Sequence, residues 1–288
     1  MRHLHQQQPG MEVAETARAL DLSRSGFSAH ARKPLRKRRS EDAVLGLEIE
    51  RTFIAARRVY GSPRILHALR QKGIRHGKNR IARLMRERGL CVRQKRRFVP
   101  RTTIACKDSP VAPNHLLERP APVRLNQIWL TDITYIPTAE GWLYLAAEMD
   151  AFSRRILGWS THATLHTDLP LAALDRALHP RAGASLPDLI HHSDRGCQYT
   201  SSEFRHRLSL CRITQSMSRK ANCYDNATIE SFWATLKSEC FGSFIPPSRA
   251  VAHSMIFDYI ETFYNPVRLH SSLAFQSPLN FELSLNHN

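Results

Sequence analysis

The sequence has little cysteine, no long hydrophobic run and little acidic charge in its first part. Six cysteines in 288 residues are too few for a disulfide scaffold, and no two lie at C-x-x-C spacing. The longest apolar run, residues 142–147, is far shorter than the roughly 20 residues that cross a bilayer, and the start lacks the apolar segment of a signal peptide. We therefore expect a globular protein with reduced thiols, a cytoplasmic location and no membrane partner.

Positive charge is concentrated in the first part of the chain. Residues 1–120 hold 28 Lys and Arg against 10 Asp and Glu, a net charge of +18, whereas residues 121–288 hold 14 and 15, a net charge of −1. A region this basic attracts a polyanion, because neutralised phosphates release their counterions. Nucleic acid is the expected partner, and an ordinary solvated basic surface is the alternative.

Two short helices are predicted in this basic part, at about 62–72 and 78–88. Ser62 suits an N-cap before Pro63, and Gly73 and Gly89 suit the left-handed position after a helix. Two helices joined by a short turn match the DNA-binding helix-turn-helix, whose second helix enters the major groove. A helical hairpin with a solvated basic face is the alternative. The DNA contacts expected on the second helix are Lys78, Arg80, Arg83 and Arg86.

A longer helix is predicted before this pair. Ser40 is its expected cap, and Leu45, Ile49 and Phe53 recur at fourfold spacing and form one apolar stripe. Residues 33–39 are almost all Pro or basic, which is typical of a linker.

The neutral second part alternates strands and helices. It is predicted to run as three strands, helix, strand, helix, strand and two helices, an order typical of a ribonuclease-H-like fold. We therefore expect an α/β fold, a ribonuclease-H-like mixed sheet flanked by helices, preceded by an all-α helix-turn-helix region. The expected strands are 128–136, 142–150, 154–161, 189–192 and 213–216, and the expected helices begin near Thr167, Thr200, Ala227 and Ser248.

Three acidic residues occupy special places in that order. Asp132 lies in the middle of the first strand, Asp194 at the exit of the fourth, and Glu230 near the start of the helix after the fifth. These places converge at one edge of such a sheet, and carboxylate oxygens suit Mg²⁺. Spacing alone is not decisive, because Asp225 and Glu261 have the same separation as Asp194 and Glu230. Their context, a helix cap and the last helix, argues against a metal site.

Longer motifs surround the three carboxylates. Residues 129–135, 191–201 and 222–237 strongly resemble the three acidic motifs of bacterial insertion-sequence transposases, namely the second-reading-frame (OrfB) product of the insertion-sequence-3 family. The core of that family is similar to retroviral integrase. Residues 60–98 resemble its helix-turn-helix segment, and residues 264–273 resemble its C-terminal signature.

The resemblance implies a DDE-type transposase, a polynucleotidyl transferase that cleaves and transfers DNA strands at the ends of an insertion sequence. Asp132, Asp194 and Glu230 would be the catalytic residues and the ligands of two Mg²⁺ or Mn²⁺ ions, and Lys237 would contact terminal DNA. Implied partners are the terminal inverted repeats, target DNA, further copies of the chain and the upstream-frame (OrfA) product, in a nucleoid-associated cytoplasmic setting.

The expected domains follow from these motifs. They are an N-terminal helical segment with a basic linker at 1–39, a helix-turn-helix DNA-binding domain at 40–100, a linker at 101–123, and a ribonuclease-H-like integrase catalytic core with a C-terminal helix and tail at 124–288.

Several neighbouring residues are predicted to be structural. Asp150 is expected to accept structural hydrogen bonds, with a role as an extra metal ligand as the alternative. His191 and His192 are expected to pack at a strand end or to contact DNA, because imidazole is a poor Mg²⁺ ligand. The stripe of Ile229, Phe232, Trp233 and Leu236 is expected in the core.

Two positions depart from the family pattern. Ala274 stands where the C-terminal signature usually has Gly, and Cys197 stands where Ser is more usual. Neither is a carboxylate. Two other functions remain open from the sequence: a non-catalytic DNA-binding regulator or inactive transposase remnant, and a ribonuclease-H-like hydrolase of RNA–DNA hybrids, which the basic helical front part disfavours.

Overall fold

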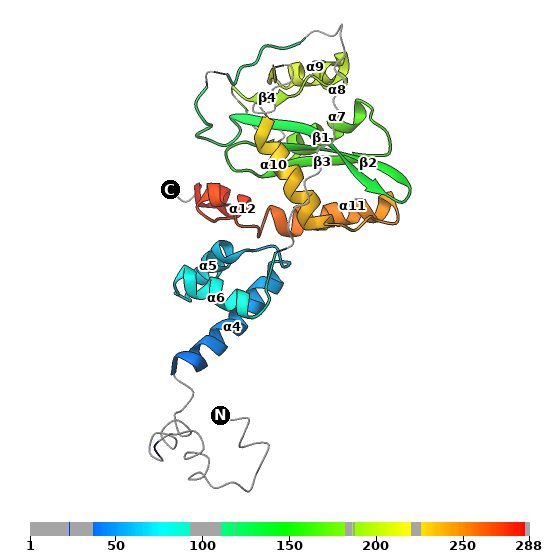
Figure 1. Cartoon of the computed structure of the whole chain (residues 1–288). Coiled ribbons are helices and arrows are strands. Elements are labelled where there is room, and N and C mark those ends of the chain that lie inside the picture. The colour runs from blue at the N-terminus through cyan, green and yellow to red at the C-terminus, as the bar shows by residue number, and fades with distance from the viewer. Residues whose placement is uncertain are drawn as a thin grey trace. The chain divides into compact units, whose positions relative to one another are not determined.

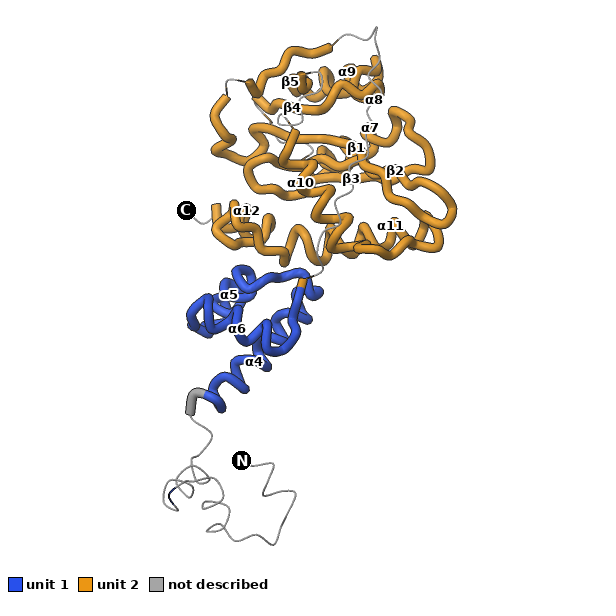
Figure 2. The backbone as a smooth tube through the Cα atoms, in the orientation of Figure 1, with its two compact units in different colours: residues 1–91 blue, residues 92–288 orange. Residues whose placement is uncertain are grey.

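The computed structural model describes residues 23, 37–92, 111–117, 119–181, 186, 188–219 and 226–285. The chain divides into two compact units, residues 1–91 and residues 92–288 (Figure 2). Within the described ranges no helix has both the length and the apolar character needed to cross a bilayer.

In residues 37–91 of the first unit, three helices pack together (Figure 1). The predicted stripe of Leu45, Ile49 and Phe53 is buried, and apolar side chains of the two following helices are buried with it. The helices are α4 (Lys37–Ala55), α5 (Ser62–Gln71) and α6 (Lys78–Glu87).

Local backbone and side-chain chemistry determines where the helices of this unit begin and end. Gly73 and Gly89 adopt positive φ values of 79° and 65° after α5 and α6, as predicted. After each of them the next residue donates its N–H to a carbonyl five residues back, which satisfies the last turn. The predicted Ser40 cap is wrong, because α4 begins at Lys37: good helix formers precede Ser40 and extend the helix through it. Likewise Gly61, rather than Ser62, is the N-cap of α5.

The second unit is built on a five-stranded sheet with the order β3-β2-β1-β4-β5. Strands β1, β2 and β3 form an antiparallel meander, and β4 and β5 continue the sheet in parallel with β1. This is the predicted mixed sheet, in the predicted element order. The strands are β1 (Ile128–Thr138), β2 (Gly141–Asp150), β3 (Ile156–His162), β4 (Ile190–Ser193) and β5 (Thr214–Met217).

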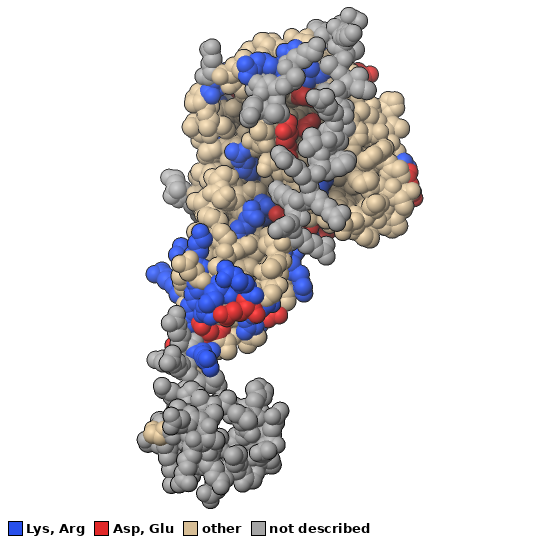
Figure 3. Space-filling view, viewed as in Figure 1, with Lys and Arg blue, Asp and Glu red and all other residues tan. Residues whose placement is uncertain are grey.

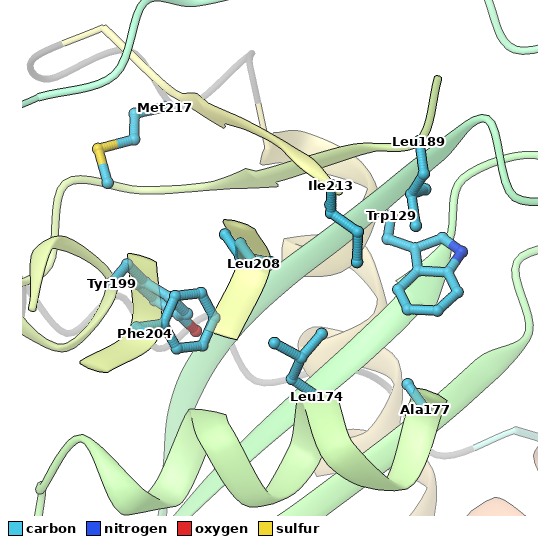
Figure 4. Packing of buried hydrophobic residues seen from close by; sticks show 9 residues of the cluster. All are labelled: Trp129, Leu174, Ala177, Leu189, Tyr199, Phe204, Leu208, Ile213 and Met217. Atoms are coloured by element: carbon cyan, nitrogen blue, oxygen red, sulfur yellow. The ribbon is translucent and has the colours of Figure 1, made fainter. Parts of the chain in front are cut away.

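Helices cover both faces of the sheet, and β1 divides its side chains between them. Trp129 packs with residues of α7, α8 and α9 in a buried apolar cluster (Figure 4). Asp132, an odd number of positions further along the strand, faces α10 on the opposite side. The first group is α7 (Asp168–Leu178), α8 (Cys197–Thr200) and α9 (Ser202–Leu210). The later helices are α10 (Ala227–Leu236), α11 (Arg249–Phe257) and α12 (Pro278–Leu285).

One helix start in this unit differs from prediction. Thr200 does not cap α9, because it closes the short helix α8, and the hydroxyl of Ser201 accepts the N–H of Phe204 instead. The helices predicted to begin near Ala227 and Ser248 are present: α10 ends at Leu236 and continues as a π-helical turn, Lys237–Phe241, and α11 similarly continues as Asp258–Tyr264.

The C-terminal segment is attached to the sheet by polar contacts. Glu282 of α12 accepts hydrogen bonds from the Ser153 hydroxyl at 2.7 Å and from the Arg155 guanidinium at 2.5 Å. The amide of Asn265 bonds both the N–H and the C=O of Ile156 on β3, each at 3.0 Å. These contacts fix α12 and the chain before it beside the β2–β3 turn.

Ala274 gives a stability prediction. It is exposed and sits in the left-handed region at φ 50°, ψ 36°, where its Cβ crowds the backbone. Replacing Ala274 with Gly should raise the free energy of unfolding by about 1 kcal/mol, because no buried surface is lost and the strain is relieved. Urea denaturation measures the change.

Ala234, which is exposed in the middle of α10, provides the matched control. The same Ala→Gly change there should lower stability by about 1 kcal/mol. If Ala274→Gly also lowers stability, the left-handed conformation is not strained.

Candidate active site

The sheet places Asp132 and Asp194 next to each other. Strands β1 and β4 are parallel neighbours in which Leu130 is paired with His192. Two residues further along each strand, the chain reaches Asp132 and Asp194. Because the two strands are parallel, an equal number of residues from the Leu130–His192 pair brings both carboxylates to the same end of the strand pair. Glu230 lies in the first turn of α10, which packs against β1.

Asp132 has a strongly perturbed carboxyl. Burial, together with the charge of Asp194 and, more weakly, that of Glu230, raises its pKa to about 7. Two donors oppose the shift, the backbone N–H of Ile133 and the indole N–H of Trp233, which lies 3.0 Å from Oδ2. The balance is a concentration of negative charge that the protein neutralises incompletely.

Asp194 and Glu230 have different surroundings. The Oδ1 atom of half-buried Asp194 accepts the N–H of Gly196 at 2.9 Å, which shapes the turn after β4. The side chain of Glu230 is exposed, although partial burial still raises its pKa. No three Asp, Glu, His or Cys side chains in the described part of the chain are close enough together to enclose a metal ion. The structure thus brings the three carboxylates into electrostatic contact without a closed coordination shell.

Lys237 is part of the same region. It follows α10 directly and is half-buried. Burial lowers the pKa of its ammonium, and the charge of Asp132 opposes that shift. A cation therefore lies within electrostatic range of Asp132.

The arginines expected to read DNA on α6 are not equivalent. Arg80 is bonded to Asp42 at 2.6 Å and lies 3.5 Å from Glu41, and Arg83 is bonded to Asp42 at 2.6 Å. Both therefore join α6 to α4. Figure 3 shows acidic side chains among the basic ones on this unit. Lys78 and Arg86 are exposed.

A basic hollow that sequence reasoning missed lies at the turn between α5 and α6. It has a volume of about 580 Å³ and is lined by Arg70, Arg75, His76 and Gly77. The signal was present in the sequence, since three of these residues belong to the turn itself. The sequence-based prediction considered only basic residues inside α6.

The residues predicted to be structural are so. Asp150 accepts the N–H groups of Asn126, Phe152 and Ser153 at 2.7–2.9 Å. His191 is fully buried, 3.0 Å from Glu148, and His192 bonds the Ser216 hydroxyl at 2.9 Å.

The core stripe of α10 and the rejected acidic pair complete the comparison with prediction. Ile229, Phe232, Trp233 and Leu236 are buried. Glu261 accepts the indole N–H of Trp159 at 2.8 Å, away from the carboxylates, as expected of a residue outside the site. Its sequence partner Asp225 lies outside the described residues.

Family models match nearly the whole described chain. Residues 122–223 match an integrase core domain, residues 211–278 match a second integrase core domain model, and residues 39–98 match an HTH-like domain.

Solved structures that match part of the chain include an intasome and an integrase catalytic core domain. A cryo-EM structure of the simian T-cell lymphotropic virus intasome in complex with PP2A regulatory subunit B56 gamma has a TM-score of 0.45 and 13% identity, covering 75% of this chain and 69% of that chain. The HTLV-2 integrase catalytic core domain in complex with magnesium, in its trimeric form, has a TM-score of 0.39 and 15% identity, covering 54% of this chain and 95% of that chain.

Full-length relatives are more closely similar. The chain is 42% identical over 263 residues to the insertion element IS600 uncharacterized 31 kDa protein of Shigella sonnei, covering 90% of this chain and 94% of the relative. It is 40% identical to the transposase for insertion sequence element IS904 of Lactococcus lactis, covering 85% and 96%, and 33% identical to transposase InsF for insertion sequence IS3A of Escherichia coli, covering 97% and 96%. Similarity over this share of both partners establishes that the chain belongs to the insertion-sequence-3 family of transposases.

Proposed function

We propose that this transposase cleaves DNA at the ends of its insertion sequence and joins the freed 3′ ends to target DNA. Asp132, Asp194 and Glu230 are the proposed catalytic carboxylates. The observation that carries the proposal is that parallel β1 and β4 carry Asp132 and Asp194 to one end of the strand pair, where Asp194 and Glu230 both act electrostatically on Asp132. All three acidic residues are present, which supports an active enzyme over an inactive remnant.

The donor set fits a divalent cation. Carboxylate oxygens are preferred ligands of Mg²⁺ and suit Mn²⁺ as well. The raised pKa of Asp132 reflects first its burial and then the charges of Asp194 and Glu230, and a bound cation would favour the ionised carboxylate. We assign Asp132 and Asp194 as the closer pair of ligands and exposed Glu230 as the one that completes the site for two ions.

The three carboxylates, Gly196 and Lys237 have different proposed roles in phosphoryl transfer. A divalent cation held by the three carboxylates would activate a water or a 3′-hydroxyl and stabilise the leaving oxygen of a phosphodiester. The turn that Gly196 stabilises keeps the Asp194 carboxylate oriented. The ammonium of Lys237, near Asp132, attracts a DNA phosphate to the same place.

The first unit supplies DNA binding in this proposal. Arg80 and Arg83 join α6 to α4, so phosphate contacts fall to exposed Lys78 and Arg86 and to the hollow lined by Arg70 and Arg75. The ligands are the terminal inverted repeats. Further copies of the chain and the upstream-frame product are the proposed partners in pairing two ends, in the nucleoid of the cytoplasm.

The first test concerns Asp194. Asp194→Asn keeps an oxygen for the Gly196 N–H but removes the charge that a cation needs. Cleavage of a labelled terminal repeat in Mg²⁺ should fall by about 10³-fold, while DNA affinity changes less than about threefold. Asp175→Asn, which removes an exposed aspartate of α7 paired with Arg207, is the control and should cleave normally. Retained cleavage by Asp194→Asn would rule out its assigned role.

The second test follows from the pKa of Asp132. Because its folded-state pKa of about 7 exceeds the ordinary value of 3.8, the folded chain holds the extra proton between these values. Its free energy of unfolding therefore falls as pH rises from about 4 to 7. In EDTA, Asp132→Asn should be more stable than the unmodified chain by roughly 1–3 kcal/mol at pH 8 and equal to it at pH 4.

Thermal unfolding at both pH values measures this difference. Mg²⁺ should stabilise the unmodified chain at pH 8 and leave Asp132→Asn unchanged. Equal stability of the two proteins at pH 8 in EDTA would show that Asp132 is not under electrostatic strain.

The third test separates the two sets of arginines. The double change Arg70→Gln and Arg75→Gln should reduce the slope of log affinity against log salt concentration by about 2, because two phosphate contacts are lost. Arg83→Gln should leave that slope unchanged and lower the melting temperature only slightly, because exposed ion pairs contribute little to stability. Binding of terminal-repeat DNA across a salt series measures both slopes. An unchanged slope in the double variant together with a reduced slope in Arg83→Gln would instead assign the phosphate contacts to α6.

A further inference from the structure

We propose that Trp233 is a positioning residue for the carboxylate site, holding Asp132 in place and fixing the helix that carries Glu230 against β1. The inference rests on the proposed role of these carboxylates in cation binding. It concerns a residue that the sequence predicts only as part of the apolar core of α10.

The contact itself is direct. The indole Nε1 of Trp233 donates to Oδ2 of Asp132 at 3.0 Å. The indole is held by packing: Trp233 is only 5% exposed, and its ring lies 4.8 Å from that of Phe232, which packs against Tyr264 in turn. The direction of its N–H is therefore set by the core, and the core sets where the Asp132 carboxylate points.

A second hydrogen bond makes this contact part of a pair. The side-chain amide of Asn226, the N-cap of α10, donates to the carbonyl of Thr131 at 3.2 Å, and Asn226 is itself buried. The two bonds from α10 thus reach consecutive residues of β1, Thr131 and Asp132. They come from positions four residues before and three residues after Glu230. At 3.6 residues per turn, positions 226, 230 and 233 share one side of the helix.

This arrangement suits a cation ligand. A carboxylate offers about four lone-pair sites, and the two N–H donors to Asp132, from Ile133 and Trp233, leave about half of them open. The indole donor also favours the charged form of Asp132, against the burial that opposes it. Groups that orient metal ligands in this way are typically worth about 10–100-fold in metal affinity.

The chain supplies a matched control for a purely structural role. Trp159 donates its indole N–H to Glu261 at 2.8 Å, a bond of the same chemistry in the same unit but between β3 and the helical turn after α11. Replacing either tryptophan with Phe removes one indole–carboxylate bond and keeps an aromatic ring.

The experiment compares Trp233→Phe and Trp159→Phe in the full chain. Calorimetric titration with MgCl₂ should give an affinity about 10–100-fold weaker for Trp233→Phe and unchanged for Trp159→Phe, at matched thermal stability. Mg²⁺ should also change the tryptophan fluorescence of the unmodified chain and of Trp159→Phe, and this change should disappear in Trp233→Phe. Unaltered affinity and a persisting fluorescence change in Trp233→Phe would overturn the inference.

A measurement on the unmodified chain covers the case in which Trp233→Phe does not fold. The indole N–H resonance of Trp233, identified by substituting the other three tryptophans in turn, should shift when MgCl₂ is added and should not shift in Asp132→Asn. A resonance that stays fixed while Mg²⁺ binds would overturn the inference and leave the proposed function intact. Absence of Mg²⁺ binding by the unmodified chain would instead overturn the proposed function, and the inference with it.

Discussion

The parallel pairing of β1 with β4 is the constraint on which the site depends. It carries Asp132 and Asp194 forward from one register pair and places two carboxylates in a partly buried region where the charge of Asp194 disfavours ionisation of Asp132. A one-residue slip of either strand would turn its carboxylate to the opposite face of the sheet. Packing in the rest of the second unit holds β1 in this register. The apolar cluster packs against one face of β1, and α10 covers the other face with hydrogen bonds to Thr131 and Asp132.

The two units concentrate charge of opposite sign. The first carries an excess of positive charge and uses part of it internally, since Asp42 engages two arginines of α6 and leaves the turn and the helix ends to face solvent. The second gathers negative charge at one place and offsets it only partly, through N–H donors and the nearby Lys237. In the proposed function, the basic surface would bind the DNA backbone and the acidic centre would bind a divalent cation.

Much of this could be predicted from the sequence because it depends on periodicity and order. Runs of β-branched and aromatic residues predicted the strands, element order predicted the mixed sheet, and the places of Asp132 and Asp194 in that order predicted that they lie near one edge of it. Features that depend on partners distant in sequence could not be predicted. Nothing in the spacing of Arg80 shows that Asp42, on another helix, binds it, and Trp233 looks like any aromatic residue of a buried stripe until the structure places Asp132 beside its N–H. The N-cap of α9 was predicted one residue early, at Thr200 and not at Ser201, because neighbouring hydroxyl residues compete for the same role.

The central claim is that three carboxylates distant in sequence share a divalent cation. Crystals of the chain grown with Mn²⁺ test it most directly, because the anomalous signal of Mn²⁺ locates the ion without reference to the protein. The account predicts a peak at bonding distance from carboxylate oxygens of both Asp132 and Asp194, with Glu230 turned toward it. Mn²⁺ found only at other sites, with Asp132 and Asp194 still contacting nothing but protein donors, would contradict it.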